Sequence, residues 1–150
     1  QKGLICRFHR RVIIDFIIVA VTLSACYFNS VGSGKSSLLY SILGEMKYHD
    51  HNLPEVTING EIAYVSQKPW ILNETLKGNV LLGNSFNEDR YREALKYSCL
   101  EADLQILQNG DETEIGEKGI NLSGGQKARV SLAQAIYADK DIYLLDDPLR

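Results

Sequence analysis

Residues 31–37 of this 150-residue chain, Val-Gly-Ser-Gly-Lys-Ser-Ser, restrict its possible folds more than any other stretch. Gly32 and Gly34 lack a Cβ atom, so the backbone N–H groups around them can approach an oxyanion closely. Lys35 adds a positive charge, and a helix that starts here adds the positive end of its dipole. We therefore expect a phosphate site formed by Gly32, Ser33, Gly34, Lys35, Ser36 and Ser37.

The stretch matches the end of the P-loop pattern, G-x-x-x-x-G-K-[ST]. In that pattern the lysine reaches the β- and γ-phosphates of a nucleotide, and the hydroxyl, here Ser36, ligates magnesium. The first glycine of the pattern is replaced by Asn29, which adopts positive φ more readily than other non-glycine residues. The loop can therefore close under mild strain. An ordinary glycine-serine turn before a helix is the alternative that this stretch alone leaves open.

Composition limits the class of protein. With 45% hydrophobic residues the chain can bury one domain core, and its composition excludes disordered, collagen-like and coiled-coil proteins. The net charge of −3 gives no general attraction to nucleic acid or to an anionic membrane surface. Cys6, Cys26 and Cys99 show no metal-ligand spacing, so we expect them to be reduced, structural thiols of a cytosolic domain.

Residues 12–28 form an apolar run that is interrupted by Asp15 and preceded by basic residues. The run is slightly short for a transmembrane helix, which needs about 20 residues. A secretory leader is a second interpretation, because residues 23–26 resemble a lipoprotein cleavage site. The third is a buried parallel strand over residues 17–23 that leads into the P-loop, and we favour it for the last part of the run. We expect residues 1–28 to be an atypical segment, transmembrane-like or foreign to the domain, and residues 29–150 to form the domain.

The rest of the chain alternates between helical and strand patterns, which predicts an α/β fold. We expect helices over residues 34–43, 73–82, 88–100 and 123–138, and a short helical turn at 104–107. Strands are expected over residues 55–60, 61–65 and 141–145, and a loop over 109–121.

Residues 142–146, Ile-Tyr-Leu-Leu-Asp, have the form of the Walker B segment of P-loop NTPases. A carboxylate at the carboxyl end of a core strand lies where α/β sheets bind ligands, so Asp146 can hold magnesium through water. Asp147 then occupies the position from which a base could polarise an attacking water. An apolar run ending in aspartate is common, and this segment has little weight alone.

Residues 122–126, Leu-Ser-Gly-Gly-Gln, place a serine and two glycines at a helix N-terminus, which predicts a second anion site. At this point the chain resembles the nucleotide-binding domain of ABC transporters, for which LSGGQ is the signature motif. The P-loop, the signature and the Walker B segment follow one another in the family's order. The resemblance implies that a nucleotide is bound by Leu122, Ser123, Gly124, Gly125 and Gln126.

The resemblance can be narrowed within the family. Residues 64–71, 116–133 and 139–149 resemble the first nucleotide-binding domain of the C subfamily, the multidrug-resistance-associated and chloride-channel-like group. Gln67 matches the Q-loop glutamine, which in the family touches nucleotide, metal and attacking water. The aromatic residue that stacks on adenine has no match in residues 1–28, and Arg150 departs from the serine expected after Asp-Pro-Leu.

The resemblance implies a RecA-like P-loop NTPase core with an inserted helical subdomain at about residues 73–135, ending after the Walker B strand. It implies ATP and Mg²⁺ as ligands, with Ser36, Gln67 and Asp146 at the metal. Two such domains pair head to tail, within one polypeptide, on the cytoplasmic side of transmembrane domains that they drive. ATP hydrolysis is expected only in that complete, dimerised protein, with Asp147 and Gln67 as the catalytic residues. Asp147 stands where hydrolytic members carry glutamate, so we expect slow hydrolysis.

Three alternatives to an exporter motor stay open. An ATP-gated channel or regulatory subunit uses the same domain. A soluble ABC ATPase of translation or repair is disfavoured because the sequence has no basic patch for nucleic acid. A truncated, inactive chain is the third, since the segments that the family places after Walker B are not among residues 1–150.

Overall fold

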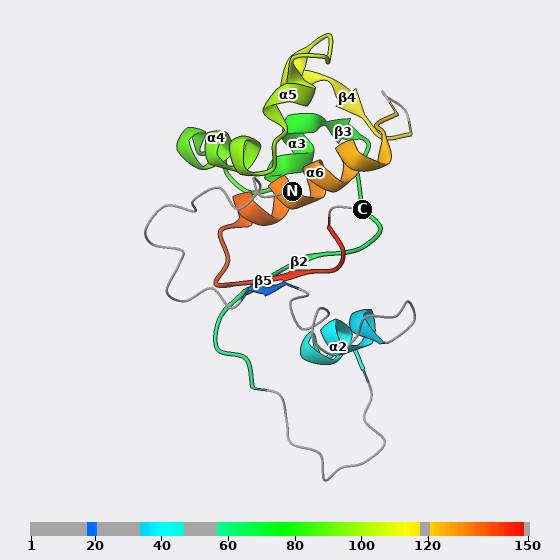
Figure 1. Cartoon of the computed structure of the whole chain (residues 1–150). Coiled ribbons are helices and arrows are strands. Elements are labelled where there is room, and N and C mark those ends of the chain that lie inside the picture. The colour runs from blue at the N-terminus through cyan, green and yellow to red at the C-terminus, as the bar shows by residue number, and fades with distance from the viewer. Residues whose placement is uncertain (1–17, 21–33, 47–56, 118–120, 149–150) are drawn as a thin grey trace, which may run out of the picture.

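The computed structural model describes residues 18–20, 34–46, 57–117 and 121–148, and a three-stranded parallel sheet lies at its centre (Figure 1). Its order is β1 (Ile18–Ala20), β5 (Ile142–Leu145) and β2 (Ile62–Val65). Leu144 of β5 lies opposite Val19 on one side and Tyr64 on the other. Because all three strands are parallel, their carboxyl ends meet at one edge of the sheet.

Helices cover both faces of this sheet, as α/β folds require. Helix α2 (Lys35–Ile42) lies on one side, and α6 (Gly124–Ala138) lies on the other (Figure 1). Tyr40 of α2 packs edge to face against Tyr64 of β2, with ring centroids 6.2 Å apart. Ala135 of α6 packs with Ala63 and Val65 of β2 in a small buried cluster.

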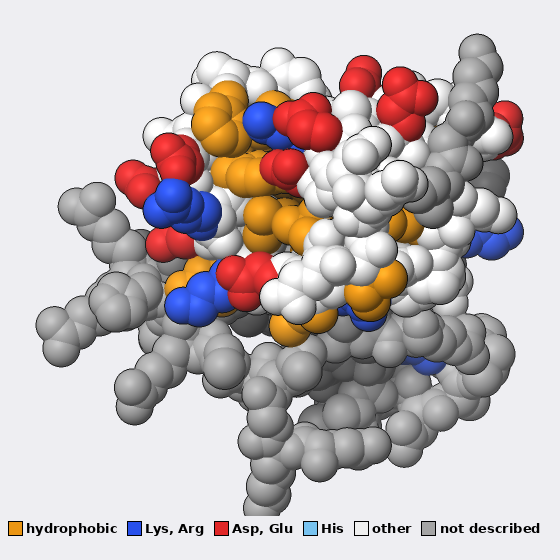
Figure 2. All heavy atoms as spheres, turned by 90° about the horizontal axis from the view of Figure 1, so that it is seen from above, with side chains coloured by type: hydrophobic (Ala, Val, Ile, Leu, Met, Phe, Trp, Pro, Cys, Tyr) orange, Lys and Arg blue, Asp and Glu red, His pale blue; other side chains and the backbone are white. Residues whose placement is uncertain are grey.

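A second layer lies beyond α6 and contains most of the buried core. Its elements are β3 (Glu74–Thr75), α3 (Leu76–Leu81), α4 (Glu88–Tyr97), α5 (Glu101–Leu104), the 3₁₀ turn η1 (Gly110–Glu112) and β4 (Glu114–Ile115). Strands β3 and β4 pair antiparallel. Seen from above in Figure 2, hydrophobic side chains in the middle of this layer are flanked by acidic and basic ones.

Helix α6 joins the two layers, which explains why its sequence shows no single apolar stripe. Val130, Ala133 and Tyr137 belong to the core of the helical layer, whereas Ala135 faces the sheet. A helix that packs on two sides is apolar over most of its circumference. The buried hydroxyl of Tyr137 donates to the carbonyl oxygen of Ser85 at 2.6 Å and accepts from the backbone N–H of Asn87 at 2.8 Å.

Side-chain caps fix where the helices begin. Thr75 accepts from the N–H of Gly78 at 2.9 Å at the start of α3, and Asn87 accepts from the N–H of Arg90 at 3.0 Å at the start of α4. Ser123 caps α6, as expected from the sequence. The described part of the chain holds no helix that combines the length and the apolarity needed to cross a membrane.

Most of the expected elements are confirmed. Residues 34–43, 88–100 and 123–138 contain α2, α4 and α6, and residues 61–65 and 141–145 contain β2 and β5. The strand expected over 17–23 is confirmed at Ile18–Ala20. The other residues of the range 1–33 lie outside the described residues, and Cys6, Cys26 and Asn29 are among them.

Five expectations at this level are wrong. Residues 57–60 form no strand, and residues 74–75 pair as β3, so the helix expected from residue 73 begins only at Leu76. The helical turn expected at 104–107 lies earlier, at Glu101–Leu104, and the expected loop contains η1 and β4. Cys99 is exposed at a positive φ of 59° after the end of α4, so it is not a buried structural thiol.

Candidate functional site

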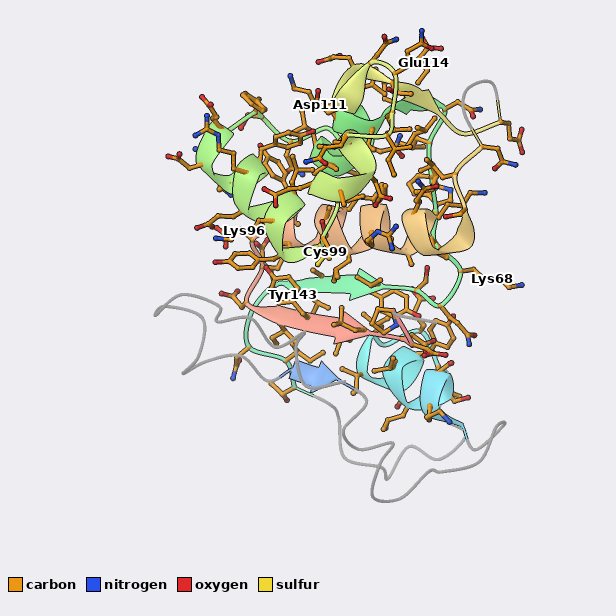
Figure 3. All side chains as sticks on the ribbon, turned by 45° about the horizontal axis from the view of Figure 1, so that its top comes forward. Lys68, Lys96, Cys99, Asp111, Glu114 and Tyr143 are labelled. Atoms are coloured by element: carbon orange, nitrogen blue, oxygen red, sulfur yellow. The ribbon has the colours of Figure 1, made fainter. Side chains whose placement is uncertain are left out.

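The carboxyl edge of the sheet brings together the residues that follow β2 and β5. The backbone N–H of Asp146 donates to the carbonyl oxygen of Val65 at 2.9 Å, which fixes Asp146 beside the end of β2. Asp146 is only 5% exposed, whereas Asp147 and Gln67 are exposed. Lys68, the residue after Gln67, points away from the body of the protein at this edge (Figure 3).

Helix α2 starts on the same side of the molecule, near the end of β5 (Figures 1 and 3). Its N-cap is Gly34, at a left-handed φ of 86°, and a Cβ atom there would meet nothing within 4 Å. The backbone N–H groups of a first helical turn have no acceptor within the helix, so they point toward the open space in front of it. Lys35, Ser36 and Ser37 form that turn, while Gly32 and Ser33 lie outside the described residues.

Tyr64 connects α2, β2 and the buried carboxylate. Its hydroxyl oxygen is buried, and it has no partner in hydrogen-bond geometry among the described residues. Burial raises the pKa of Tyr64 well above its usual range, and the neighbouring Tyr40 and Asp146 raise it further. An unsatisfied buried polar atom beside a carboxylate is unfavourable, which makes this edge suited to a polar ligand.

The oxygen donors at this edge suit Mg²⁺. A carboxylate, a hydroxyl and an amide oxygen, from Asp146, Ser36 and Gln67, are the hard ligands that this ion prefers. Mg²⁺ in nucleotide sites is held by few protein groups and takes its other ligands from phosphates and water. The chemistry of these three side chains thus fits a Mg²⁺ ion. Lys35, the first residue of α2, carries a positive charge that suits a phosphate.

The signature segment forms a self-capped helix start. The Ser123 hydroxyl oxygen accepts from the N–H of Gln126 at 3.3 Å, and the Gln126 side chain accepts from the N–H of Ser123 at 2.9 Å. This capping box leaves the hydroxyl hydrogen of the exposed Ser123 able to donate to an anion. Gly124 and Gly125 are exposed beside it, whereas Leu122 is buried in the helical core.

In the described part of the chain, the two helix starts that form the candidate anion sites lie apart. The start of α2 lies on one side of the sheet, and α6 lies on the other (Figure 1). Both helix starts lie toward the edge at which β2 and β5 end (Figures 1 and 3). Within the described residues, the start of α2 and the segments that follow β2 and β5 lie toward the same edge of the sheet, whereas α6 lies across the sheet from α2.

The structure adds three polar residues that the sequence patterns did not single out. Tyr64 lies beside Asp146, and Asp103 and Arg129 form an ion pair next to the signature. Arg129 stands three residues after Gln126, one helical turn away, which was a usable signal. The sequence contained no such signal for Asp103, because its helical pattern predicted a turn at residues 104–107 and not at α5.

A parallel sheet with a P-loop helix on one face and a carboxylate at the end of its central strand defines a P-loop NTPase fold. A model of the ABC transporter family matches residues 30–150, so the chain belongs to that family. The resemblance inferred from the motifs is therefore confirmed.

Relatives place the chain in the C subfamily. ATP-binding cassette sub-family C member 2 of Rattus norvegicus is 59% identical over 121 residues, which are 80% of this chain and 8% of that protein. Multidrug resistance protein mrp-7 of Caenorhabditis elegans is 58% identical over 119 residues, 79% of this chain and 8% of that protein. Human ATP-binding cassette sub-family C member 4 is 55% identical over 119 residues, 79% of this chain and 9% of that protein. The matched part of the chain thus spans less than a tenth of the length of these relatives.

Proposed function

We propose that the chain is the ATP-binding motor domain of an ABC-type exporter, which couples ATP binding and hydrolysis to transport across a membrane. The observation that carries the proposal is that α2 starts toward the carboxyl edge of a parallel sheet, the edge at which Gln67 follows β2 and the buried Asp146 follows β5. Open α/β sheets bind their ligands outside the carboxyl ends of the strands. The names of the relatives, a multidrug resistance protein among them, support a transporter.

Each residue at this edge has a role in the proposal. Backbone N–H groups from Gly32 to Ser37 and the Lys35 ammonium bind the phosphates. Ser36, Gln67 and Asp146 would hold Mg²⁺, which would neutralise the charge of the phosphates. Asp147 and Gln67 orient and polarise the attacking water.

A second nucleotide-binding domain completes the site. In one chain the signature and the P-loop helix lie on opposite sides of the sheet, so one ATP cannot engage both. Head-to-tail pairing with another domain would place Ser123 and Gly125 against the ATP held by the partner's P-loop. The layer built by α3, α4 and α5 then corresponds to the helical subdomain, at about residues 73–135, that contacts the transmembrane domains on the cytoplasmic side. We propose that the second domain belongs to the same polypeptide.

Asp147 makes this half of the site slow in hydrolysis. It is one methylene shorter than glutamate, and its φ of 50° holds the backbone in the left-handed region. A shorter reach weakens the contact with the attacking water, because proton transfer depends steeply on distance. The site therefore binds ATP with little turnover.

The test of ATP binding uses the complete polypeptide that carries this chain and a photoreactive ATP analogue. Lys35→Ala should abolish labelling of this domain, because the lysine charge is lost at the phosphates. Lys96→Ala is the matched control, since Lys96 is an exposed lysine on α4, far from Lys68 and the sheet edge in Figure 3. Labelling of Lys35→Ala equal to that of the parent would overturn the proposal.

A further inference from the structure

An ion pair with a buried carboxylate lies directly behind the signature segment. Asp103 of α5 is only 6% exposed, and its two carboxylate oxygens accept from Arg129 of α6. Arg129 Nε lies 2.7 Å from Oδ2, and Nη2 lies 2.9 Å from Oδ1. This two-point geometry fixes the guanidinium and the carboxylate in one plane. The Arg129 guanidinium holds the pKa of Asp103 below its usual range, so the pair is charged at neutral pH.

Gln126 extends this pair to the exposed end of the helix. Its Nε2 donates to Asp103 Oδ1 at 3.2 Å, while its Oε1 accepts from the N–H of Ser123 at 2.9 Å. The N–H of Gln126 in turn donates to the Ser123 hydroxyl at 3.3 Å. A continuous chain of hydrogen bonds therefore runs from Arg129 through Asp103 and Gln126 to Ser123.

Fold stability alone gives a weak reason for such a pair. Burying the Asp103 charge costs desolvation free energy that its attraction to Arg129 only partly offsets, and an apolar residue of the same volume often stabilises a protein as well. The carboxylates of the other ion pairs in the described helical layer are far more exposed: the side chain of Glu112, 3.3 Å from Lys77, is 62% exposed, against 9% for that of Asp103. What the Asp103 pair adds is a single fixed orientation for Gln126, the last residue of the signature.

We propose that Asp103 and Arg129 are positioning residues for the composite ATP site: through Gln126 they hold the first turn of α6 in the conformation that presents Ser123 and Gly125 to the ATP of the partner domain. This inference rests on the proposed function. The Gln126 side chain contacts Asp103 on one side and Ser123 on the other, and so links the ion pair to the exposed serine. A displacement of the first turn by about 1 Å is enough to weaken a phosphate contact by a large factor.

The experiment separates this role from ATP binding by the chain's own P-loop. In the complete polypeptide, Asp103→Asn removes the charge and keeps the size of the side chain. We expect it to raise the KM for ATP hydrolysis roughly tenfold, because the signature turn is no longer held in place. Photolabelling of the domain's own P-loop should stay at the level of the parent. Glu112→Gln, which breaks an exposed ion pair of the same layer, is the matched control and should leave both values unchanged.

Two further variants keep the inference falsifiable. Asp103→Glu retains the charge and should recover most of the KM, whereas a purely steric role would not be rescued in this way. If Asp103→Asn lowers the yield of folded protein, Gln126→Leu provides the test, because it leaves the Asp103–Arg129 pair in place. It should raise the KM by a similar factor.

A KM equal to that of the parent in Asp103→Asn, or in Gln126→Leu, would overturn the positioning role. Loss of P-loop labelling in Asp103→Asn, with Glu112→Gln normal, would also contradict it, because the effect would then be on folding or on the wrong site. A parent polypeptide that does not bind ATP at Lys35 would contradict the proposed function itself. The two failures are therefore distinguishable.

Discussion

The hydroxyl of Tyr137 fixes the end of α6 to the start of α4, and Tyr137→Phe removes it without changing the ring. Tyr137 is only 1% exposed, and its oxygen takes part in two hydrogen bonds, at 2.6 Å to Ser85 and at 2.8 Å from Asn87. The edge-to-face contact with Tyr91, with ring centroids 6.3 Å apart, is retained in phenylalanine. The variant therefore isolates the hydrogen bonds.

The magnitude follows from those two bonds. A typical intramolecular hydrogen bond contributes about 1 kcal/mol net, and a buried group left without a partner costs about 1–3 kcal/mol. Ser85 and Asn87 are exposed residues, so water can reach their backbone groups after the change. We therefore expect the free energy of unfolding to fall by about 2 kcal/mol, which is about 1 kcal/mol for each of the two hydrogen bonds lost.

Urea denaturation followed by circular dichroism measures this change, with an unchanged m-value showing that the unfolding reaction is the same. Tyr91→Phe is the graded comparison, because the Tyr91 hydroxyl makes one hydrogen bond, to Asp111 Oδ2 at 3.0 Å. It should cost about 1.5–2 kcal/mol, because a single hydrogen bond to a charged carboxylate contributes more than a neutral one. A Tyr137→Phe protein within about 0.5 kcal/mol of the parent would refute the reasoning, since that is the usual scatter of a neutral substitution.

Three other changes test separate parts of the structure. Gly116→Ala should destabilise by at least about 2 kcal/mol in the same assay, because φ is 105° and the added Cβ would lie 2.4 Å from Asn73 Oδ1; a neutral result would contradict this backbone geometry. The lowered pKa of Asp103 contributes stability that is fully present above the ordinary aspartate pKa of about 3.9 and is lost as pH falls through the folded value. Asp103→Asn should therefore lower neutral-pH stability by about 1–2 kcal/mol, because the partly exposed Arg129 stays solvated, and show a flatter acid unfolding profile; an unchanged profile would argue against the pair. Asp147→Glu in the complete polypeptide should raise ATP turnover, whereas turnover no faster than that of the parent would count against the short-reach explanation.

The elements with strong local signals could be predicted from the sequence. Ser123 with Gln126 three residues later is a capping box, and it locates the start of α6 correctly. Asn87 followed by two acidic residues does the same for α4. The apolar run before Asp146 predicts β5, although its central place in the sheet follows only from its pairing with both β1 and β2.

The remaining elements depend on contacts between distant residues. Glu74 and Thr75 have no strand pattern of their own and pair only because Glu114 and Ile115 lie beside them. The strand expected at residues 55–60 alternated well, yet its described part stays unpaired. Tertiary pairing decided both cases.

The candidate site divides in the same way. Lys35, Ser36, Asp146 and the signature were recognised because each belongs to a short motif whose chemistry is local. Tyr64 and Asp103 were not, since their relevance comes from neighbours far away in the sequence: Asp146 for the tyrosine, Gln126 and Arg129 for the aspartate. Such residues become visible only when the fold brings the segments together.

The central claim is that this P-loop binds ATP in a site that a second nucleotide-binding domain completes, so we expect ATP to bring the two domains together. The most direct measurement places one fluorophore on an exposed position of α4 and another on the partner domain of the complete polypeptide, and follows energy transfer during titration with ATP and Mg²⁺. The parent should show a saturable increase in energy transfer that Lys35→Ala abolishes, because both half-sites need bound ATP to close. An increase that persists in Lys35→Ala, or a parent that does not respond to ATP, would contradict the account.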